Sequence, residues 1–194
     1  MSQRRISKLA PAWTVMGVAM LLAGCGSDPR PATIPTPSFS CTPDPAGAPC
    51  TAELAAAQAE ETRAYAEAEF AYREFTKERN RLLQSGGSVA QTSQMERYAT
   101  GPYLEEMAND LKIVHDNGLK STGEITVGNF GRKDSSSDRL EFYLCEDASA
   151  VRVFDSTGKQ ISQGRLGALR VIAVGGDGER KIEDTELAEE WKCL

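Results

Sequence analysis

Residues 51–84 read TAELAAAQAEETRAYAEAEFAYREFTKERNRLLQ and decide the fold, because the whole stretch favours one kind of secondary structure. Alanine, glutamate, arginine and leucine dominate it, Thr51 suits the N-cap position, and Gly86-Gly87 ends the run. The apolar residues that recur near helical spacing are Leu54, Ala57, Ala64, Ala68, Ala71, Tyr72 and Phe75. We therefore predict one long amphipathic helix. A coiled coil is the alternative, but alanines interrupted by Glu61 match an a/d seam poorly.

Two shorter helical segments follow, and the pattern then changes to strands. A helical turn is expected through residues 95–99, and a further helix between Pro102, which suits the first helical position, and Asn117-Gly118, which suits the end. Beyond it, apolar and polar residues alternate, with a polar loop expected at Gly131–Asp138. The expected strands cover residues 125–130, 140–145, 151–154, 166–174 and 181–187. Helices first and an antiparallel meander second predict an α+β domain with helices on one face of the sheet.

The N-terminus has the layout of a secretory signal peptide. Arg4, Arg5 and Lys8 precede a mostly apolar run at Leu9–Ala23. This run is shorter than the roughly 20 apolar residues that a membrane-spanning helix needs. We interpret residues 1–24 as a signal that is removed. The Arg4-Arg5 pair suggests twin-arginine export, but the polar residues that follow it favour the general secretory route.

Residues 22–25, Leu-Ala-Gly-Cys, resemble the lipobox of bacterial lipoproteins. The resemblance implies that a diacylglyceryl group is attached to the Cys25 sulfur and that the chain is cleaved before this residue. Two buried acyl chains hold a soluble domain stably on a membrane. We therefore expect a lipoprotein anchored to the cell membrane on its extracytoplasmic face, with the membrane as its partner through Cys25. The alternative is an ordinary signal peptide followed by a coincidental cysteine.

Residues 25–50 predict an extended tether between the anchor and a domain at residues 51–194. Seven of the nine prolines fall between Pro29 and Pro49, among threonine, serine and glycine. Such a stretch contains too few large apolar residues to offset the entropy of ordering it. We expect it to hold the domain away from the membrane.

The charge balance bears on the partner. The chain has 22 Lys+Arg and 28 Asp+Glu, which gives a net charge of −6. Binding to nucleic acid is driven by clustered lysine and arginine, which neutralise phosphates. The acidic composition therefore argues against nucleic acid as a partner.

Four cysteines remain once Cys25 is assigned to lipid, which is an even number in an oxidising compartment. Three pairings are possible in principle. Cys41 and Cys50 bracket a turn-rich loop that could close locally, and a bond between Cys145 and Cys193 would clip the tail to the sheet. We predict these two disulfides. Zinc binding is the alternative, but no C-x-x-C spacing exists and the chain has one histidine.

The order of elements resembles the NTF2-like (SnoaL-like) cone fold, and more narrowly the small lipoproteins of actinobacteria that are built on it. The resemblance runs from Thr51 to the C-terminus and implies N-terminal helices packed on a curved antiparallel sheet. The residues that carry it are Ala71-Tyr72-Arg73-Glu74-Phe75, Tyr98-Ala99-Thr100-Gly101-Pro102, Asn117-Gly118-Leu119 with Gly123, Leu144-Cys145-Glu146-Asp147 and Val153-Phe154-Asp155-Ser156-Thr157-Gly158-Lys159. The sequence departs from the family at the last strand, where Arg180-Lys181-Ile182 replaces a Trp-containing segment and Trp191 comes later.

Members of the wider fold include isomerases, hydratases and epoxide hydrolases that use carboxylates, tyrosine or histidine inside the cone. Glu141 and Tyr143 would share one strand face here, and His115 is the sole histidine. These three are the catalytic candidates. Each also has a structural interpretation, as a solvated strand face for Glu141 and Tyr143 and as a packing or surface residue for His115.

Our leading hypothesis from the sequence is a non-enzymatic lipoprotein whose domain binds a small apolar ligand or an envelope protein. An enzyme of the isomerase or hydratase type is the alternative, and a structural dimer that uses the open sheet face is the third. We expect no cofactor and no metal, because Gly158-Lys159 lacks the rest of a phosphate-binding loop and Asp134–Asp138 lacks the glycine of a calcium loop.

Overall fold

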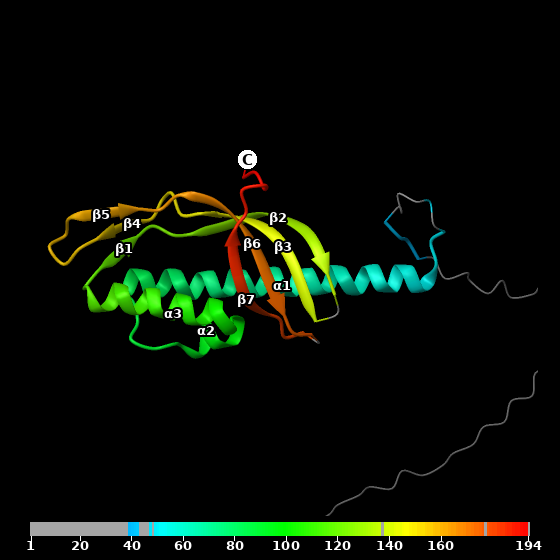
Figure 1. Cartoon of the computed structure of the whole chain (residues 1–194), viewed down its shortest axis with the longest axis horizontal. Helices are drawn as coiled ribbons and strands as arrows, with labels where there is room; N and C mark the ends of the chain where they lie inside the picture. The colour runs from blue at the N-terminus through cyan, green and yellow to red at the C-terminus, as the bar shows by residue number, and fades with distance from the viewer. Residues whose placement is uncertain (1–38, 43–46, 48, 137, 177, 194) are drawn as a thin grey trace, which may run out of the picture. The chain divides into compact units, whose positions relative to one another are not determined.

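The computed structural model describes residues 39–42, 47, 49–136, 138–176 and 178–193. The predicted signal peptide, Cys25 and most of the predicted tether lie outside these residues. The described residues belong to one compact unit that begins at Phe39. Its elements are α1 (Ala52–Ser85), α2 (Ser93–Tyr98), α3 (Gly101–Asp116), β1 (Lys120–Thr122), β2 (Thr126–Ser135), β3 (Arg139–Asp147), β4 (Arg152–Phe154), β5 (Gln160–Gln163), β6 (Leu166–Val174) and β7 (Lys181–Leu187). The predicted α+β class is confirmed, with one long helix and two antiparallel sheets (Figure 1).

Three segments of the chain each run through both sheets. The four-stranded sheet has the order β2-β3-β6-β7 and the three-stranded sheet the order β1-β4-β5. β1 leads into β2, β3 into β4 and β5 into β6, so a bend crosses three neighbouring segments. At this bend Gly123 has a φ of +79°, and a Cβ there would lie 2.2 Å from the Ala150 carbonyl oxygen. Glycine therefore permits the close approach that the bend requires.

Helix α1 packs on the four-stranded sheet, and we call the sheet face toward it the inner face. The core residues of α1 include Ala68, Ala71, Tyr72 and Phe75, all at most 2 % exposed, as the helical spacing predicts. They pack with Leu140, Phe142 and Leu144 of β3 in one hydrophobic cluster. The predicted stripe was wrong at its start, because Leu54 is only half-buried and Ala57 is exposed. The reason is visible in Figure 1, where the first turns of α1 extend past the sheet.

Side chains of α1 also form hydrogen bonds with the backbone of the edge segment that runs from β1 to β2. Arg73 donates to the Val127 carbonyl oxygen at 2.7 Å, and Gln84 donates to that of Gly123 at 2.9 Å. Between them, Asn80 both donates to and accepts from the Ile125 backbone, each at 2.9 Å. The three side chains are spaced seven and four residues apart and so lie on one helix face. They satisfy backbone groups that an edge strand otherwise leaves open.

Two short strands were not predicted, and one stretch predicted as loop is a strand. β1 and β5 were not predicted, and residues 131–135, predicted as loop, continue β2. The pairing of β2 with β3 shifts register between Gly128 and Gly131, where Asn129 adopts a positive φ of 52°. A bulge of this kind breaks the period-two pattern, and an edge strand tolerates polar residues. Both effects hid the second half of β2.

Both predicted disulfides form. Cys41–Cys50 closes a loop at the start of α1, where the Thr42 backbone exchanges hydrogen bonds with the Gln58 side chain at 2.7 and 3.3 Å. Cys41, Thr42 and Cys50 are therefore tied to the folded unit, although they were predicted as part of the tether. Cys145–Cys193 joins β3 to the C-terminal tail.

The C-terminal tail lies on the outer face of the four-stranded sheet, opposite α1. Trp191 stacks on Tyr143 with ring centroids 5.1 Å apart and planes at 8°. Gly131 on the neighbouring strand has no side chain, and a Cβ there would lie 2.2 Å from the Trp191 ring. The late tryptophan thus covers part of the sheet from outside, and glycine makes the space for it.

Candidate functional site

Two of the predicted catalytic residues, Glu141 and Tyr143, lie on the outer face as a pair. Glu141 accepts a hydrogen bond from Lys133 at 3.1 Å and lies 3.4 Å from Arg170. The hydrogen bond from Lys133 is the main reason that the pKa of Glu141 is lowered. Tyr143 donates to Glu190 of the tail at 3.0 Å. Both side chains thus belong to a network of ion pairs on the sheet surface.

The third candidate, His115, lies in a different layer of the molecule. It is near the end of α3, its side chain is half exposed, and its Nδ1 is 3.3 Å from the carboxylate of neighbouring Asp116. The sheet separates it from Glu141 and Tyr143, because α3 packs on the inner side and those residues face outward. The structure therefore does not bring the three predicted residues to one cavity.

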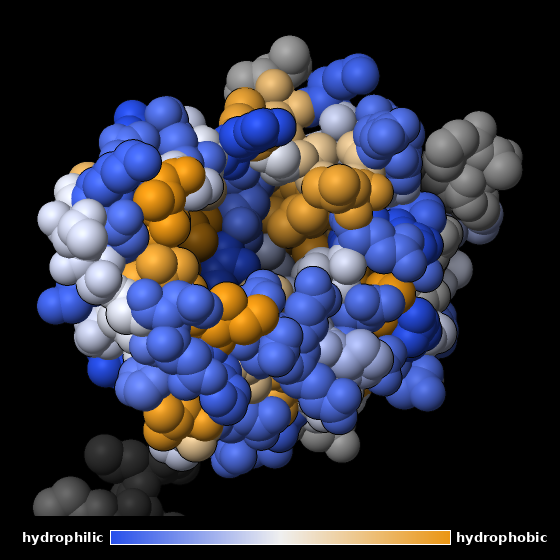
Figure 2. All heavy atoms as spheres, turned by 60° about the vertical axis from the view of Figure 1, so that its left-hand side comes forward, coloured by the Kyte–Doolittle hydropathy of each residue, from blue (hydrophilic) through white to orange (hydrophobic). Residues whose placement is uncertain are grey.

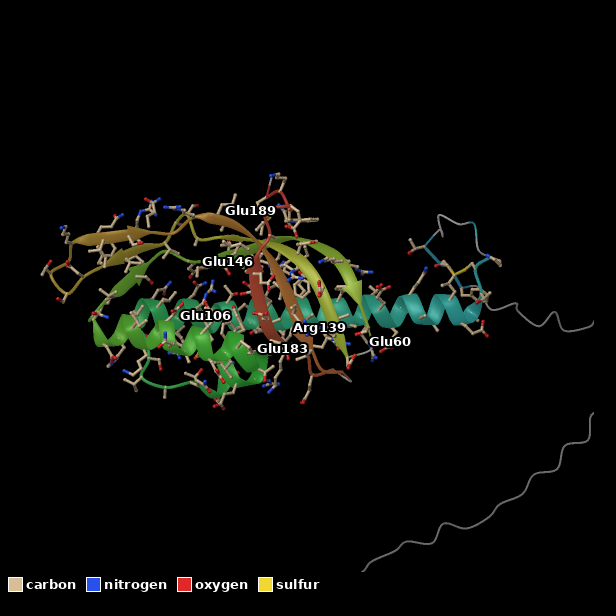
Figure 3. The ribbon with its side chains drawn as sticks, viewed as in Figure 1. Glu60, Glu106, Arg139, Glu146, Glu183 and Glu189 are labelled. Carbon is tan, nitrogen blue, oxygen red and sulfur yellow. A yellow bond between two sulfur atoms is a disulfide. The ribbon has the colours of Figure 1, made fainter. Side chains whose placement is uncertain are left out.

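A different set of polar residues meets between α1, α3 and the inner face, and we call it the inner cluster: Tyr72, Arg79, Tyr103 and Glu146. Arg79 Nη2 lies 2.6 Å from Glu146 Oε1. Tyr72 donates to Glu146 Oε2 at 2.7 Å. Tyr103 stacks on Tyr72 with ring centroids 6.4 Å apart. Figure 3 shows Glu146 in the space between the sheet and the helices.

The local sequence explains why these residues point inward. Tyr72 and Arg79 are seven residues apart and follow the buried stripe of α1. Glu146 continues the alternation of Leu140, Phe142 and Leu144 by one more step. Tyr72 was predicted on the apolar face of the long helix, whereas Arg79 and Glu146 were not predicted as a pair. The signal that could have predicted the pair is that α1 and β3 each carry a charged residue, of opposite sign, at a position that faces the core.

Burial fixes the protonation of the cluster. It raises the pKa of Tyr72 well above its usual value and that of Tyr103 to about 12, so both phenols stay protonated near neutral pH. Desolvation lowers the pKa of Arg79, but the attraction of Glu146, Tyr103 and Tyr72 together with the hydrogen bond to Glu146 outweighs it, so this pKa is raised overall. The cluster therefore presents a permanent cation and neutral hydroxyl groups.

Arg79 retains hydrogen-bonding capacity beyond its pair with Glu146. Its Nε has no hydrogen-bond partner among the described residues, and its Nη1 reaches only the Met107 sulfur, at 3.8 Å. The Tyr103 hydroxyl likewise has no hydrogen bond of normal geometry within the described part of the chain. Buried donors of this kind normally have a partner, such as an ordered water molecule or a ligand.

A hollow of about 260 Å³ opens onto Arg79 and Glu146. Its other walls come from α1, α3 and the bend of the sheet, namely Leu83, Met107, Asp110, Leu111 and Ile125. Figure 2 views the end of the domain that carries β4 and β5, and shows a hollow with a hydrophilic floor between hydrophobic side chains. Apolar walls with a few polar groups at the base are typical of small-molecule sites.

Comparison with known proteins adds little to this geometry. No family model and no curated protein matches the chain. A solved structure, the intermembrane space region of the chloroplast protein ARC6, is similar at 15% identity, and the match covers 62% of this chain and 92% of that one with a TM-score of 0.44. Among the described residues, none of the helices combines the length and apolar character that crossing a membrane requires.

Proposed function

We propose that this chain is a lipid-anchored protein of the cell envelope whose domain binds a small, mostly apolar ligand in the hollow beside the inner cluster. The observation that carries the proposal is the buried Arg79, which lines the hollow together with mostly apolar side chains. Its Nε has no hydrogen-bond partner among the described residues. A ligand with an apolar body and one acceptor oxygen matches these walls and this donor.

A cone of the NTF2-like type is the architecture we propose for this site. Its support is the bend that crosses three strand segments and the helices that lie along the inner face of the sheet. A hollow between helices and a curved sheet is where such a fold would hold a ligand. The proposal concerns the fold alone and carries no activity with it.

The other two hypotheses have weaker support. An isomerase or hydratase based on Glu141, Tyr143 and His115 lacks a shared cavity for those residues. A dimer through the open sheet face would compete with the C-terminal tail, since Trp191 already stacks on Tyr143 there. If an envelope protein is the occupant instead, the ligand experiment below should show an adduct of protein mass rather than of small-molecule mass.

Native mass spectrometry of the full chain, released from its own host envelope in a nonionic detergent, tests ligand binding. We expect an adduct that is lost on denaturation and is absent from Met107→Trp, which fills the hollow. Ile113→Trp is the matched control on the same helix, because Ile113 is 49% exposed and does not line the hollow. It should keep the adduct. An unmodified mass for the parent chain, or an adduct that survives in Met107→Trp, would contradict the proposal.

Membrane anchoring is tested separately through Cys25, which lies outside the described residues. Cys25→Ser should move the protein from the detergent phase to the aqueous phase in a temperature-induced phase separation, because the thiol that accepts the lipid is removed. Cys41→Ser is the control and should leave the partition unchanged. Retention of Cys25→Ser in the detergent phase would overturn the anchoring proposal and leave the ligand proposal standing.

A further inference from the structure

A second and larger pocket, of about 460 Å³, lies on another part of the domain. We call it the arginine pocket. It is formed by the middle of α1, the end of α2 and the segment that leads into β7, and it shares no lining residue with the hollow. Its basic residues are Arg63, Arg97, Arg180 and Lys181.

The arginine pocket is positively charged in an acidic chain. Its carboxylates are those of Glu67 and Glu179, against four basic side chains. Glu67 lies 3.9 Å from Arg63 and 4.0 Å from Arg180, longer than a direct hydrogen bond to either. Arg63 also pairs directly with Glu60, Nη2 to Oε1 at 2.5 Å, so these two guanidinium groups already have carboxylates close to them.

The other two cations have no carboxylate partner among the described residues. The Arg97 guanidinium lies over the Tyr98 ring, 5.6 Å from its centroid, a contact that involves the ring face and no carboxylate. Lys181 donates to the Glu96 backbone carbonyl oxygen at 2.8 Å, a neutral acceptor. The two charges come from different elements and meet at one pocket, so an anion placed there would contact both.

An aromatic wall stands beside these charges. Phe70 is 56% exposed and packs edge-to-face on Tyr98 with ring centroids 6.0 Å apart. Ala66 and Ala71 complete this wall. Their small side chains leave space beside the Phe70 ring. A ligand that covers this exposed apolar side chain removes its surface from water, which favours binding.

We propose that the arginine pocket binds a small organic anion, in which a carboxylate or phosphate group is joined to an aromatic or short apolar body. The anionic group lies against Arg97 and Lys181, and the body lies on Phe70 and Tyr98. Guanidinium groups suit oxyanions because their planar array of N–H donors can bind two oxygens at once. The volume falls within the range of about 300–1,000 Å³ for small-molecule sites.

Isothermal titration calorimetry of the full chain in nonionic detergent tests this proposal with phenyl phosphate as the probe. We expect saturable binding that weakens at least tenfold in Arg97→Ala. Arg165→Ala removes an exposed arginine outside the pocket and should change the affinity less than twofold. Absence of saturable binding, or equal weakening by the two variants, would overturn the proposal.

The apolar body has its own test. Inorganic phosphate should bind several-fold more weakly than phenyl phosphate, and Phe70→Ala should reduce that difference while leaving the phosphate affinity nearly unchanged. Benzyl alcohol, which has the ring without the charge, should not bind. If inorganic phosphate binds as tightly as phenyl phosphate, the pocket recognises the anion alone, and the proposal of an organic ligand is wrong.

Discussion

Strand β3 carries two glutamates that have similar exposure but face opposite layers of the molecule. The side chains of Glu141 on the outer face and Glu146 on the inner face are 20% and 16% exposed. Their cationic partners differ more, because Arg79 is 11% exposed, whereas Arg170 and Lys133 are 27% and 31% exposed. The contribution of a carboxylate to the free energy of unfolding therefore depends on how deeply the cation that it neutralises is buried.

The largest expected effect separates these two glutamates. Glu146→Gln keeps the shape of the side chain but leaves the Arg79 charge buried, and we expect a loss of about 3–5 kcal/mol in the free energy of unfolding. Glu141→Gln is the matched control, with an expected loss below about 1 kcal/mol, because its partners reach water and Arg170 also pairs with Glu186. Urea unfolding followed by circular dichroism measures both. Equal losses would contradict the comparison.

A double variant tests the physical reason. If the uncompensated charge of Arg79 destabilises Glu146→Gln, then replacing both partners in Arg79→Met/Glu146→Leu should restore most of the lost stability. No recovery would mean that the hydrogen bond from Tyr72 and the shape of the pair matter more than the charge.

The next largest loss of stability is expected when the C-terminal tail is released from the outer face. The bond between Cys145 and Cys193 closes a segment with a sequence separation of 48, and the variant Cys145→Ala/Cys193→Ser should lose about 2–4 kcal/mol of unfolding free energy. Cys41→Ser/Cys50→Ser is the control, with a sequence separation of 9 in a loop that contacts the start of α1. We expect a smaller loss there, since a disulfide that closes a shorter segment removes less entropy from the unfolded chain. Thermal unfolding under matched conditions compares the two variants.

The inner face should also govern stability in alkali. Burial raises the pKa of Tyr103 to about 12, above the value of about 10 in an unfolded chain. The folded state then holds a proton that the unfolded state releases, so stability is full below about pH 10 and is lost as pH rises towards 12. Tyr72 acts in the same direction. Tyr103→Phe should flatten the decline, by at most about 1.4 kcal/mol per pH unit. An unchanged slope would contradict this assignment.

The smallest effect lies on the outer face in acid. The hydrogen bond from Lys133 lowers the pKa of Glu141 below its unfolded value, so its contribution to stability is present above about pH 4.3 and is lost as pH falls through the lower, folded pKa. Lys133→Met should raise this pKa, as followed by the carboxyl carbon resonance in an NMR titration. Arg165→Lys provides a control at a distance. An unaltered Glu141 titration in Lys133→Met would show that Arg170 alone sets it.

Much of the secondary structure could be predicted because its signals are local. The cap at Thr51 and the glycines at 86 and 87 bound α1 to within one residue, and the apolar run at Leu166–Val174 gave β6 its full length. The disulfide pairs followed from the positions of the cysteines along the chain. β1 and β5 carried too few residues to show a period, and the bulge at Asn129 disrupted the alternation in β2.

The sequence by itself determined the α+β class, the main elements, the two disulfides and the faces on which strand residues are grouped. Alternation in β3 separates Glu141 from Glu146, but it does not say which of the two meets the long helix. Only the tertiary structure decided this, because the crossing of α1 and α3 over the bent sheet brings together residues that are distant in sequence. That crossing placed Arg79 against Glu146 and left Glu141 on the outer face, paired with Lys133 and Arg170. The packing of α2 and of the segment before β7 against α1 likewise assembled the arginine pocket, although none of these three elements contains a recognisable binding motif alone.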